Sequence, residues 1–517
     1  MKLSGLLFAA ALLGSCTQPA AEENYTRHVD PKIGTGGHGH VFVGANVPFG
    51  LVQVGPTSIP QTWDWCSGYH ASDSTVIGFS HTHLSGTGIG DLFDITVMPV
   101  VGEVTYARGE ENDPASGLWS YADRTREITK PGYYSVPLVR YGITAELTAT
   151  ERVGLHRYTF PASDAAAVVF DLENGGCWDK ATDTGFRFSD DSTRIAGWRC
   201  STGWAKNQEV YFVAEFSKPA KGISYLQPGE IDDSKMPRIA ARYARVDFDT
   251  AEGEQVLVKV ALSPVSIEGA KANLAAELPG WDFDAPAAAA DKAWNDELSK
   301  VKIETEDETS KRIFYTALYH TMVAPSLFCD VNGDYRGADG KVHENPGRDT
   351  YTTFSLWDTY RAAMPLMTVL HPERMPDIIQ TMLHIADEQG RLPVWHLWGN
   401  ETDCMVGNPG IVAVADAIVK GIGGFDREKA FETIRKTAMN PDRGNGLRME
   451  YGYIPCEMFN EAVAYDMEYA LADGAAARAA EALGKAEDAK YFEERSHSYR
   501  NYFDPATRFM RGRDSRK

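Results

Sequence analysis

The pattern of apolar residues changes once along the chain, and this change limits the folds that the sequence can adopt. From about residue 25 to about residue 266, β-branched and aromatic residues gather in short runs of strand length. Clusters of Gly, Asp, Pro and Ser separate these runs. After about residue 304, apolar residues instead recur at three- and four-residue steps, as they do in helices. The sequence therefore predicts a β-rich half followed by a helical half.

The first half contains several clear strand-like runs and no helical segment between them. The clearest runs are residues 134–140, 143–149, 167–172 and 208–216. Many short strands without intervening helices favour a β-sandwich or a barrel. An Ala-rich, charged stretch at 282–300 follows and predicts a helix that connects the two halves.

The second half is predicted to consist of helices joined by loops rich in Gly, Pro, Asn and Trp. The helical segments are expected at 310–323, 357–370, 376–387, 411–421, 427–439, 458–483 and 486–502. No strand-like blocks alternate with them, which argues against a TIM barrel or a Rossmann sheet. Paired helices in a bundle, solenoid or α/α toroid fit better, and the lack of a fixed-period repeat counts against a solenoid.

Length and charge restrict the domain count and the partners. A chain of 517 residues exceeds the roughly 250–300 residues that one hydrophobic core usually serves, so we expect two domains. The net charge of −21 repels phosphate backbones and anionic lipid headgroups. Nucleic acid is therefore excluded as a partner, and a neutral ligand fits better.

The N-terminus has the pattern of an export signal. Lys2 precedes an apolar run at 6–13 that is too short to remain as a membrane span, and the run ends in Leu-Gly-Ser-Cys at Cys16. This ending resembles a bacterial lipobox, which predicts a signal peptide at 1–16, lipidation of Cys16 and a tether at 17–24. An ordinary secretory signal is the alternative. We expect a protein of the periplasm or outer membrane that touches the membrane only through its lipid anchor.

The six cysteines after Cys16 match neither a zinc site nor a dense disulfide framework. Cys177 and Cys200 could pair across a hairpin in an oxidising compartment. Buried thiols without disulfides are the preferred interpretation, because cysteine is among the most buried residue types.

Three loops rich in Gly, His and Trp stand out in the first half, at 33–40, 63–70 and 79–88. Trp63, Asp64 and Trp65 combine two indoles with a carboxylate, a set that suits a sugar: Trp packs on the apolar face of a pyranose and Asp accepts hydrogen bonds from hydroxyls. Each loop alone could equally be a turn with structural histidines. The pair His81 and His83 could also bind a metal, although no carboxylate has supporting ligand spacing.

Two segments of the second half carry similar chemistry. Trp357 and Asp358 open a predicted helix, where Asp358 could alternatively serve as an N-cap. Residues 391–405 place Trp, His, Asn400 and Glu401 in a predicted loop between helices, and polar, aromatic loops often bind ligands. The alternating Asp330, Asn332 and Asp334 do not form an EF-hand, since Tyr335 and Lys341 replace its required Gly and Glu. A polar hairpin or turn is expected there.

At these motifs the sequence resembles glycoside hydrolase family 92, the calcium-dependent exo-α-mannosidases. The matching stretches are residues 29–56, 62–88, 352–366 and 390–408, and the resemblance covers essentially everything after the signal segment. It implies a mixed α and β fold with a β-sandwich domain at 25–268, linker helices at 269–305 and an incomplete (α/α)6 barrel at 306–517. The implied reaction is inverting hydrolysis of a terminal α-mannoside in an N-glycan or mannan, aided by Ca²⁺.

The resemblance also implies the roles of particular residues. The matching positions carry over as contacts to a mannose-containing glycan: Trp63, Asp64, Trp65, Trp357, Asp358, Asn400 and Glu401. The family's general acid and base are expected in motifs beyond Lys517, so no catalytic residue is assigned in this chain and the calcium ligands are unassigned. We therefore expect an α-1,2-type mannosidase whose present copy is impaired. A lipid-anchored glycan-binding remnant, or a break in a longer gene, are the alternatives.

Overall fold

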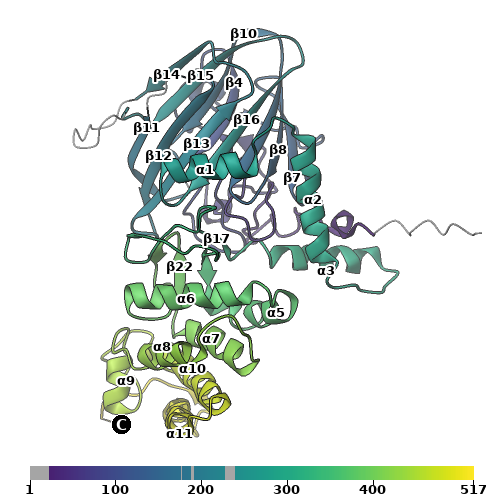
Figure 1. The fold of residues 1–517 in the computed structure, drawn as a ribbon. Coiled ribbons are helices and arrows are strands. Elements are labelled where there is room, and N and C mark those ends of the chain that lie inside the picture. Colours follow the sequence, from purple (N-terminus) through teal and green to yellow (C-terminus); the bar gives the residue numbers. More distant parts are fainter. Residues whose placement is uncertain (1–22, 176, 188–190, 228–238, 517) are drawn as a thin grey trace, which may run out of the picture.

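The fold is given by a computed structural model, in which residues 23–516 are described apart from residue 176 and the segments 188–190 and 228–238. The predicted signal peptide at 1–16, Cys16 and nearly all of the tether lie outside the described residues. The order of elements confirms the predicted class: a β-rich part comes first and a helical part follows it (Figure 1). Within the described residues, no helix combines the length and apolarity that crossing a bilayer requires.

Two antiparallel sheets form the first part. The first has six strands in the order β1 (Gly55–Thr57), β3 (Gly78–Ser80), β4 (Thr96–Val101), β10 (Ser163–Asp171), β15 (Tyr243–Thr250) and β14 (Gly222–Leu226). The second has eight, in the order β11 (Lys180–Arg187), β12 (Arg194–Thr202), β13 (Gln208–Phe216), β16 (Glu254–Ser263), β9 (Val153–Phe160), β8 (Ile143–Ala149), β7 (Tyr133–Leu138) and β6 (Ile128–Lys130). The short strands β2 (Thr75–Val76) and β5 (Ser120–Tyr121) pair separately.

Aromatic side chains from the two sheets meet between them and form the core. Phe170 on β10 stacks on Phe212 of β13, with 5.9 Å between the ring centroids, and Phe248 on β15 packs edge-on against Phe216 of β13 at 5.8 Å. All four rings are buried. Each buried phenylalanine contributes about 1.5–3 kcal/mol relative to an exposed one. Because the paired rings come from strands of different sheets, the two sheets pack face to face as a sandwich.

Helix α1 (Ile267–Glu277) lies across the outer face of the eight-stranded sheet (Figure 1). Its N-cap, Ser266, accepts a hydrogen bond from the amide of Gly269, which fixes where the helix begins. Leu274 and its apolar neighbours on α1 pack on Leu155 and Val213 of the sheet. The outer face of this sheet is therefore covered over part of its length and carries a second, smaller apolar cluster.

Helices α2 (Asp284–Leu298) and α3 (Glu308–His320) carry the chain from the sandwich to the second part. The buried indole of Trp294 packs 4.4 Å from the ring of Tyr319 and donates its N–H to the carbonyl of Asn46 at 2.7 Å. The predicted helix at 282–300 is thus confirmed, and it is anchored to a loop of the sandwich.

The predicted turn at 329–340 joins the two parts. The amide of Gly333 donates to the carbonyl of Asp330, which closes the turn. The buried carboxylate of Asp330 accepts hydrogen bonds from the hydroxyl of Ser263, the last residue of β16, and from the amide of Asn273 on α1, both at 2.8 Å. This acidic side chain therefore serves the joint between the two parts.

Between residues 326 and 401 the second part contains short strands, of which the sequence analysis allowed only for a hairpin at 329–340. They are β17 (Ser326–Leu327), β18 (Tyr335–Arg336), β19 (Val342–His343), β20 (Tyr351–Thr352), β21 (Phe354–Ser355), β22 (Trp395–Leu397) and β23 (Asn400–Glu401). The segment expected to be a loop at 391–405 is a hairpin of β22 and β23 in one sheet with β21. Trp398 and Gly399 form its two-residue turn, both with positive φ, which is the backbone of a type I′ turn.

The helix predicted at 357–370 is also wrong as a single element. It is divided into α4 (Leu356–Thr359) and α5 (Ala363–Leu370). Pro365 explains the division, because within a continuous helix its ring would clash with the carbonyl of Arg361 and it has no N–H to donate. In the structure Pro365 falls in the first turn of α5, where neither problem arises.

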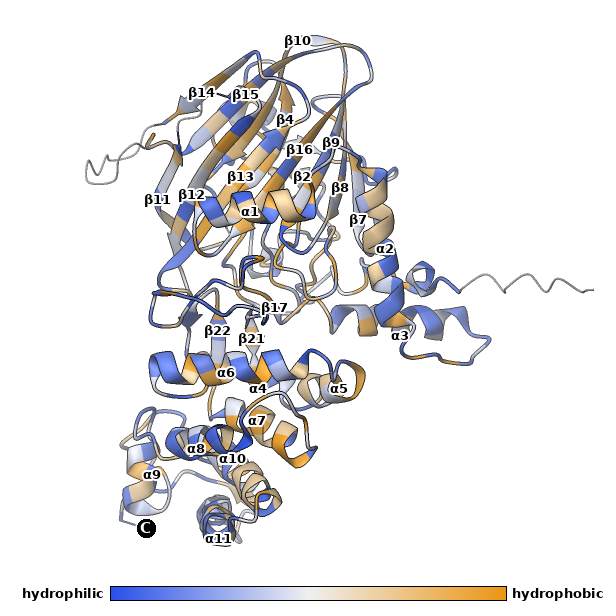
Figure 2. Ribbon diagram, in the orientation of Figure 1, coloured by the Kyte–Doolittle hydropathy of each residue, from blue (hydrophilic) through white to orange (hydrophobic). Residues whose placement is uncertain are grey.

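The remaining helices pack in successive layers below the sandwich (Figure 1). They are α6 (Met375–Gln389), α7 (Pro409–Val419), α8 (Arg427–Ala438), α9 (Asn445–Tyr451), α10 (Ala462–Ala482) and α11 (Ala486–Arg495). The segment predicted as one helix at 486–502 ends early and continues as the 3-10 turn η4 (Ser498–Asn501) and the hairpin of β24 (Phe503–Asp504) and β25 (Phe509–Met510). Helix α7 is hydrophobic along most of its length (Figure 2), which agrees with its burial between neighbours.

Candidate functional site

The turn that carries Trp63, Asp64 and Trp65 is a short 3-10 helix, η2 (Trp63–Trp65), in a loop of the sandwich. The carboxylate of Asp64 accepts hydrogen bonds from two imidazoles, His38 at 2.6 Å and His40 at 3.3 Å. The hydrogen bond from His38 is the main reason that the pKa of Asp64 is lowered. Asp64 is therefore a carboxylate held in its ionised form between two histidines.

Trp63 is half-exposed, with 50% of its surface accessible. Its indole N–H donates to the carbonyl of Gly88 at 2.9 Å, and His40 packs edge-on against its ring at 4.2 Å. A side chain at residue 88 would collide with the ring, since an added Cβ would lie 2.5 Å from it. The glycine thus lets an accessible indole rest directly on the backbone.

Trp65 differs from Trp63, because its ring is already engaged. It stacks on His70 with 4.4 Å between centroids and 18° between planes, and its N–H donates to the carboxylate of Asp73 at 2.7 Å. One face of the Trp65 ring and its indole N–H therefore already have partners within the protein. Trp65 supports the loop more directly than it offers a surface to a ligand.

A second accessible indole, Trp178, was missed by the sequence analysis. Its backbone amide donates to the carbonyl of Gly90, and an added Cβ at Gly90 would lie 2.7 Å from its ring. Trp63 and Trp178 thus lie against the same short segment, at Gly88 and Gly90. The alternation of glycines in the sequence GTGIG was the signal that could have pointed to them.

The hairpin residues Asn400 and Glu401 make contacts that organise the protein. The carboxylate of Glu401 accepts hydrogen bonds from the amides of Val394 and Trp395 at 2.8 and 2.9 Å. The side chain of Asn400 accepts from the backbone amide of Asn207 and donates to its carbonyl, both at 3.0 Å. Glu401 therefore supports the hairpin internally, and Asn400 fastens it to the loop between β12 and β13.

Trp357 and Asp358 lie on α4. Asp358 is exposed and accepts a hydrogen bond from the hydroxyl of Ser355, which itself occupies the N-cap position. The indole N–H of Trp357 is buried and has no acceptor among the described residues, while the guanidinium of Arg361 lies 4.7 Å from its ring centre. A buried donor without a partner costs free energy unless a bound group satisfies it.

The two sets of predicted residues are connected through neighbouring loops rather than by direct contact. The indole N–H of Trp63 donates to the carbonyl of Gly88. Three residues later, the carboxylate of Asp91 accepts a hydrogen bond from the amide of Ala205 at 3.0 Å. Two residues after Ala205, the amide of Asn207 donates to the side chain of Asn400. Among the described residues, no hydrogen bond or ring contact joins η2 directly to α4. Asn207 and Asn400 therefore link the sandwich to the hairpin of the helical part, and the gathering of all the predicted residues around one sugar stays a prediction.

The histidines His81 and His83 are core residues in the structure. Nδ1 of His81 donates to the carbonyl of Ile95 at 2.6 Å, which leaves its Nε2 to accept from His156 at 2.9 Å; Nδ1 of His83 lies 2.8 Å from the carbonyl of Gln53. Burial lowers the pKa of His81 to about 3 and that of His83 to about 4. Both rings are neutral and engaged, so they do not act as a metal-binding pair here.

One group of side chains has the spacing of a metal site, but it does not fit calcium. Glu297, His371 and Glu373 bring their ligand atoms within 4.8 Å of one another. The ammonium of Lys300 already lies among them, 2.7 Å from Glu297, 2.9 Å from Glu373 and 3.3 Å from His371. Calcium prefers six to eight oxygen ligands, whereas this group supplies two carboxylates, one nitrogen and its own cation.

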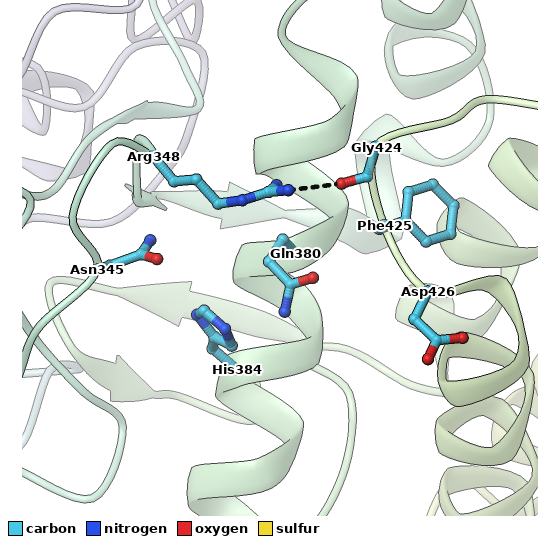
Figure 3. A pocket seen from close by; sticks show the side chains of 7 residues that line it. All are labelled: Asn345, Arg348, Gln380, His384, Gly424, Phe425 and Asp426. Atoms are coloured by element: carbon cyan, nitrogen blue, oxygen red, sulfur yellow. Dashed lines mark hydrogen bonds between the residues drawn. The ribbon is translucent and has the colours of Figure 1, made fainter.

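An open cavity of about 470 Å³ lies beside α6, and none of its lining residues belongs to the predicted site (Figure 3). It is lined by Asn345, Arg348, Gln380, His384, Gly424, Phe425 and Asp426. Arg348 donates to the carbonyl of Gly424 at 2.8 Å and pairs with Asp377 at 3.0 Å. Asp426 caps the amides of α8. Its main charged groups are thus already satisfied within the protein.

Comparison with known proteins covers both parts. Residues 28–263 match the glycosyl hydrolase family 92 N-terminal domain, and residues 269–517 match the glycosyl hydrolase family 92 catalytic domain. A family 92 α-mannosidase from Bacteroides thetaiotaomicron, solved in complex with mannoimidazole, is 39% identical with a TM-score of 0.91, over 96% of this chain and 66% of that one. An inverting mannosidase of the same family and organism is 28% identical, with a TM-score of 0.84, over 95% and 67%.

A curated relative from Arthroderma benhamiae, described as an uncharacterized secreted glycosidase, is 26% identical over 559 residues. The match includes 98% of this chain and 66% of the relative. The chain thus spans about two thirds of the length of the relatives that it matches.

Proposed function

Because the two family matches together include most of its residues, the chain belongs to glycosyl hydrolase family 92, and we propose that it takes part in the hydrolysis of terminal α-mannosides. The observation that carries the proposal is the accessible indole of Trp63 beside the ionised carboxylate of Asp64. An indole face packs on the apolar face of a pyranose, and a carboxylate accepts two hydrogen bonds from vicinal hydroxyls. The mannosidase structures with which it shares its fold support the same sugar.

The reaction that we propose is inversion at the anomeric carbon. In an inverting hydrolase, one carboxylic acid protonates the leaving oxygen and a second carboxylate activates water on the opposite face of the sugar. We assign neither role to a residue of this sequence, because the motifs in which the resemblance places them do not occur among its 517 residues. The residues proposed to contact the glycan are Trp63, Asp64, Trp65, Trp357 and Asp358. Asn400 and Glu401, expected as contacts from the sequence, are proposed to position the hairpin beside the sugar, because their side chains already bond within the protein.

We propose α-1,2-linked mannose of N-glycans or mannan as the substrate, with calcium as the cofactor, both by family resemblance. When bound, calcium would help to hold the sugar hydroxyls. The Glu297 group does not supply its site, so the ligands are not assigned. Export and lipidation at Cys16, with location in the periplasm or outer membrane, remain proposals from the N-terminal sequence. Incorporation of a labelled fatty acid by the wild type and its loss in Cys16→Ala would test the anchor.

The test of the function compares binding and hydrolysis. Trp63→Ala is expected to weaken binding of α-1,2-mannobiose about 3- to 10-fold, since an aromatic contact contributes about 0.5–1.5 kcal/mol. Trp281→Ala is the matched control, because it removes an exposed indole between α1 and α2. Calorimetric titration measures both, and equal affinity for wild type and Trp63→Ala would contradict the proposal.

Hydrolysis separates the enzyme from the alternative, a glycan-binding protein without turnover. We expect residues 1–517 alone to bind the disaccharide with little release of free mannose, because they contain neither acid nor base motif. Chromatographic detection of mannose measures release, with chelator added as a second arm. Rapid, chelator-sensitive release by these residues would contradict the proposed impairment while supporting the mannosidase assignment.

A further inference from the structure

Cys66 and Cys177 lie more than a hundred residues apart in sequence but are neighbours in the fold. Cys66 directly follows Trp65 and ends the η2 turn, and its side chain is fully buried. Its thiol donates a hydrogen bond to the carbonyl of Trp63 at 2.7 Å, and the thiol of Cys177 lies close enough that each thiol shifts the pKa of the other. Cys177 is only partly buried and directly precedes Trp178.

The backbone around Gly88 and Gly90 independently brings the two cysteine segments together. The carbonyl of Gly88 accepts the indole N–H of Trp63, three residues before Cys66. An added Cβ at Gly90 would lie 2.8 Å from the Cβ of Cys177. Both cysteine-bearing segments therefore pack on one three-residue stretch, which keeps their thiols within reach of each other.

We propose that Cys66 and Cys177 are a redox site, at which a reversible disulfide fastens the η2 turn to the segment that carries Trp178. This pairing replaces the Cys177–Cys200 disulfide considered from the sequence. In the structure all six cysteines of the described residues are without disulfides, which corresponds to the reduced form. Formation of the disulfide would fix the positions of the Trp63 and Trp178 indoles relative to each other, beside the Gly88–Gly90 stretch.

The oxidation proceeds by thiol–disulfide exchange with an external disulfide, such as oxidised glutathione or a dithiol oxidase. The neighbouring thiol of Cys66 lowers the pKa of Cys177, so the less buried thiol is also the more readily ionised one. Its thiolate attacks the oxidant, forms a mixed disulfide and releases one thiol. Cys66 then loses its proton and attacks the sulfur of Cys177, which expels the second thiol. Two protein thiols are oxidised and one external disulfide is reduced to two thiols.

Peptide mapping can test which cysteines pair, because trypsin places Cys66, Cys177 and Cys200 on three different peptides. Cleavage after Lys and Arg gives residues 33–108 with Cys66, 158–180 with Cys177 and 200–206 with Cys200. The protein is incubated with oxidised glutathione, its remaining thiols are blocked with N-ethylmaleimide, and the digest is analysed by mass spectrometry. We expect peptide 33–108 joined to 158–180 with the loss of two hydrogens, and separation of the two by reductant.

Two other outcomes would overturn the inference. One is a joined pair of 158–180 and 200–206, which would restore the alternative pairing. The other is N-ethylmaleimide on both Cys66 and Cys177 after oxidation. None of these readouts depends on mannose binding or release, so a failure here is distinguishable from a failure of the proposed function.

Variants supply a second measurement. Cys177→Ser should melt several degrees lower than the wild type after oxidation and at the same temperature under reductant, because a disulfide across so long a loop stabilises the oxidised protein. Cys404→Ser is the matched control, since it removes a thiol of similar burial in the helical part. Equal melting of oxidised wild type and Cys177→Ser would contradict the proposal.

Discussion

Each part of the molecule buries an arginine between two aspartates, but the surroundings differ. In the sandwich, the fully buried Arg199 lies 2.6 Å from Asp94 and 3.0 Å from Asp179, and the core of this part contains many large aromatic and aliphatic side chains. In the helical part, Arg448 on α9 lies 2.6 Å from both Asp466 and Asp473 on α10. The neighbouring buried residues of α10 are mostly alanines.

The comparison indicates that the two parts are stabilised differently. Alanines bury little apolar surface each, so the last helices depend more on close backbone approach and on the Arg448 cluster than the sandwich depends on Arg199. Large apolar side chains are also exposed in the helical part, for example Val369 at 69%, Val419 at 50% and Leu471 at 44%. We therefore expect the helical part to open first.

Removing the two arginines gives the largest expected effect and the clearest test of this difference. Arg448→Ala leaves the buried carboxylate of Asp466 without a cation, while Asp473 keeps Arg495 at 3.1 Å. It should destabilise the helical part by about 3–5 kcal/mol. Hydrogen exchange should then rise in α10 while β8 stays protected. Arg199→Ala is the counterpart in the sandwich, and Arg435→Ala, which removes an exposed arginine, is the control. Loss of protection in β8 and α10 together would show that the two parts unfold as one.

Acid should destabilise both parts, because the second part also buries neutral histidines: burial lowers the pKa of His396 to about 3 and that of His320 to about 4. His81, His83 and His156 are buried and neutral, with pKa values lowered by burial, while an unfolded histidine titrates near pH 6.5. Below that pH the unfolded chain binds more protons than the folded one. Stability is therefore present above about pH 6.5 and is lost as the pH falls toward 4, by about 2 kcal/mol per histidine at pH 5.

Two carboxyls offset part of this loss, since burial raises the pKa of Asp171 and of Asp330 to about 6. Urea unfolding at pH 7 and pH 5, followed by exchange in each part, measures the balance. Loss of stability in one part alone on acidification would contradict this expectation.

The junction offers a smaller and sharper test. Asn400→Ala removes both hydrogen bonds to the backbone of Asn207, at about 0.5–1.5 kcal/mol each, and should cost about 1–3 kcal/mol. Asn207→Ala keeps those backbone groups and should change stability far less, which makes it the matched control. Thermal unfolding of both variants measures the difference, and equal losses would contradict a stabilising role for this contact between the parts.

The smallest effect is expected at the Glu297 group. Glu373 is largely exposed and pairs with Lys300, so Glu373→Gln should change stability by less than about 1 kcal/mol. Calcium uptake, measured by titration calorimetry, should not change. A loss of calcium binding in this variant would show that the ion can displace the Lys300 ammonium.

The sequence predicted the sandwich better than the helical part, for physical reasons. The expected strand boundaries at 143–149 and 208–216 agree with β8 and β13, because an alternating pattern reports directly which side chains face the core. The helices α6, α7 and α8 were also found within about two residues. The spacing of apolar residues was less informative where backbone geometry decided the secondary structure. Pro365 divides the helix predicted at 357–370, and the Trp398–Gly399 turn makes a hairpin of the loop predicted at 391–405.

The candidate site shows the same limit. Residue types identified Trp63 and Asp64 as a set suited to a sugar, and the structure places them side by side with two histidines. The same reasoning could not see that the ring of Trp65 is covered by His70 or that the carboxylate of Glu401 is used by backbone amides. Nor could it find Trp178 or Asn207, because their importance comes from neighbours distant in the sequence.

The buried carboxylate of Asp330 has a mechanical consequence for how a ligand could enter. It joins the turn at 329–340 to β16, through Ser263, and to α1, through Asn273. A hinge motion at this point would therefore have to break buried hydrogen bonds to a carboxylate. Entry of a ligand at this junction would then rely on small rearrangements of surface side chains, while the backbone on either side stays rigid.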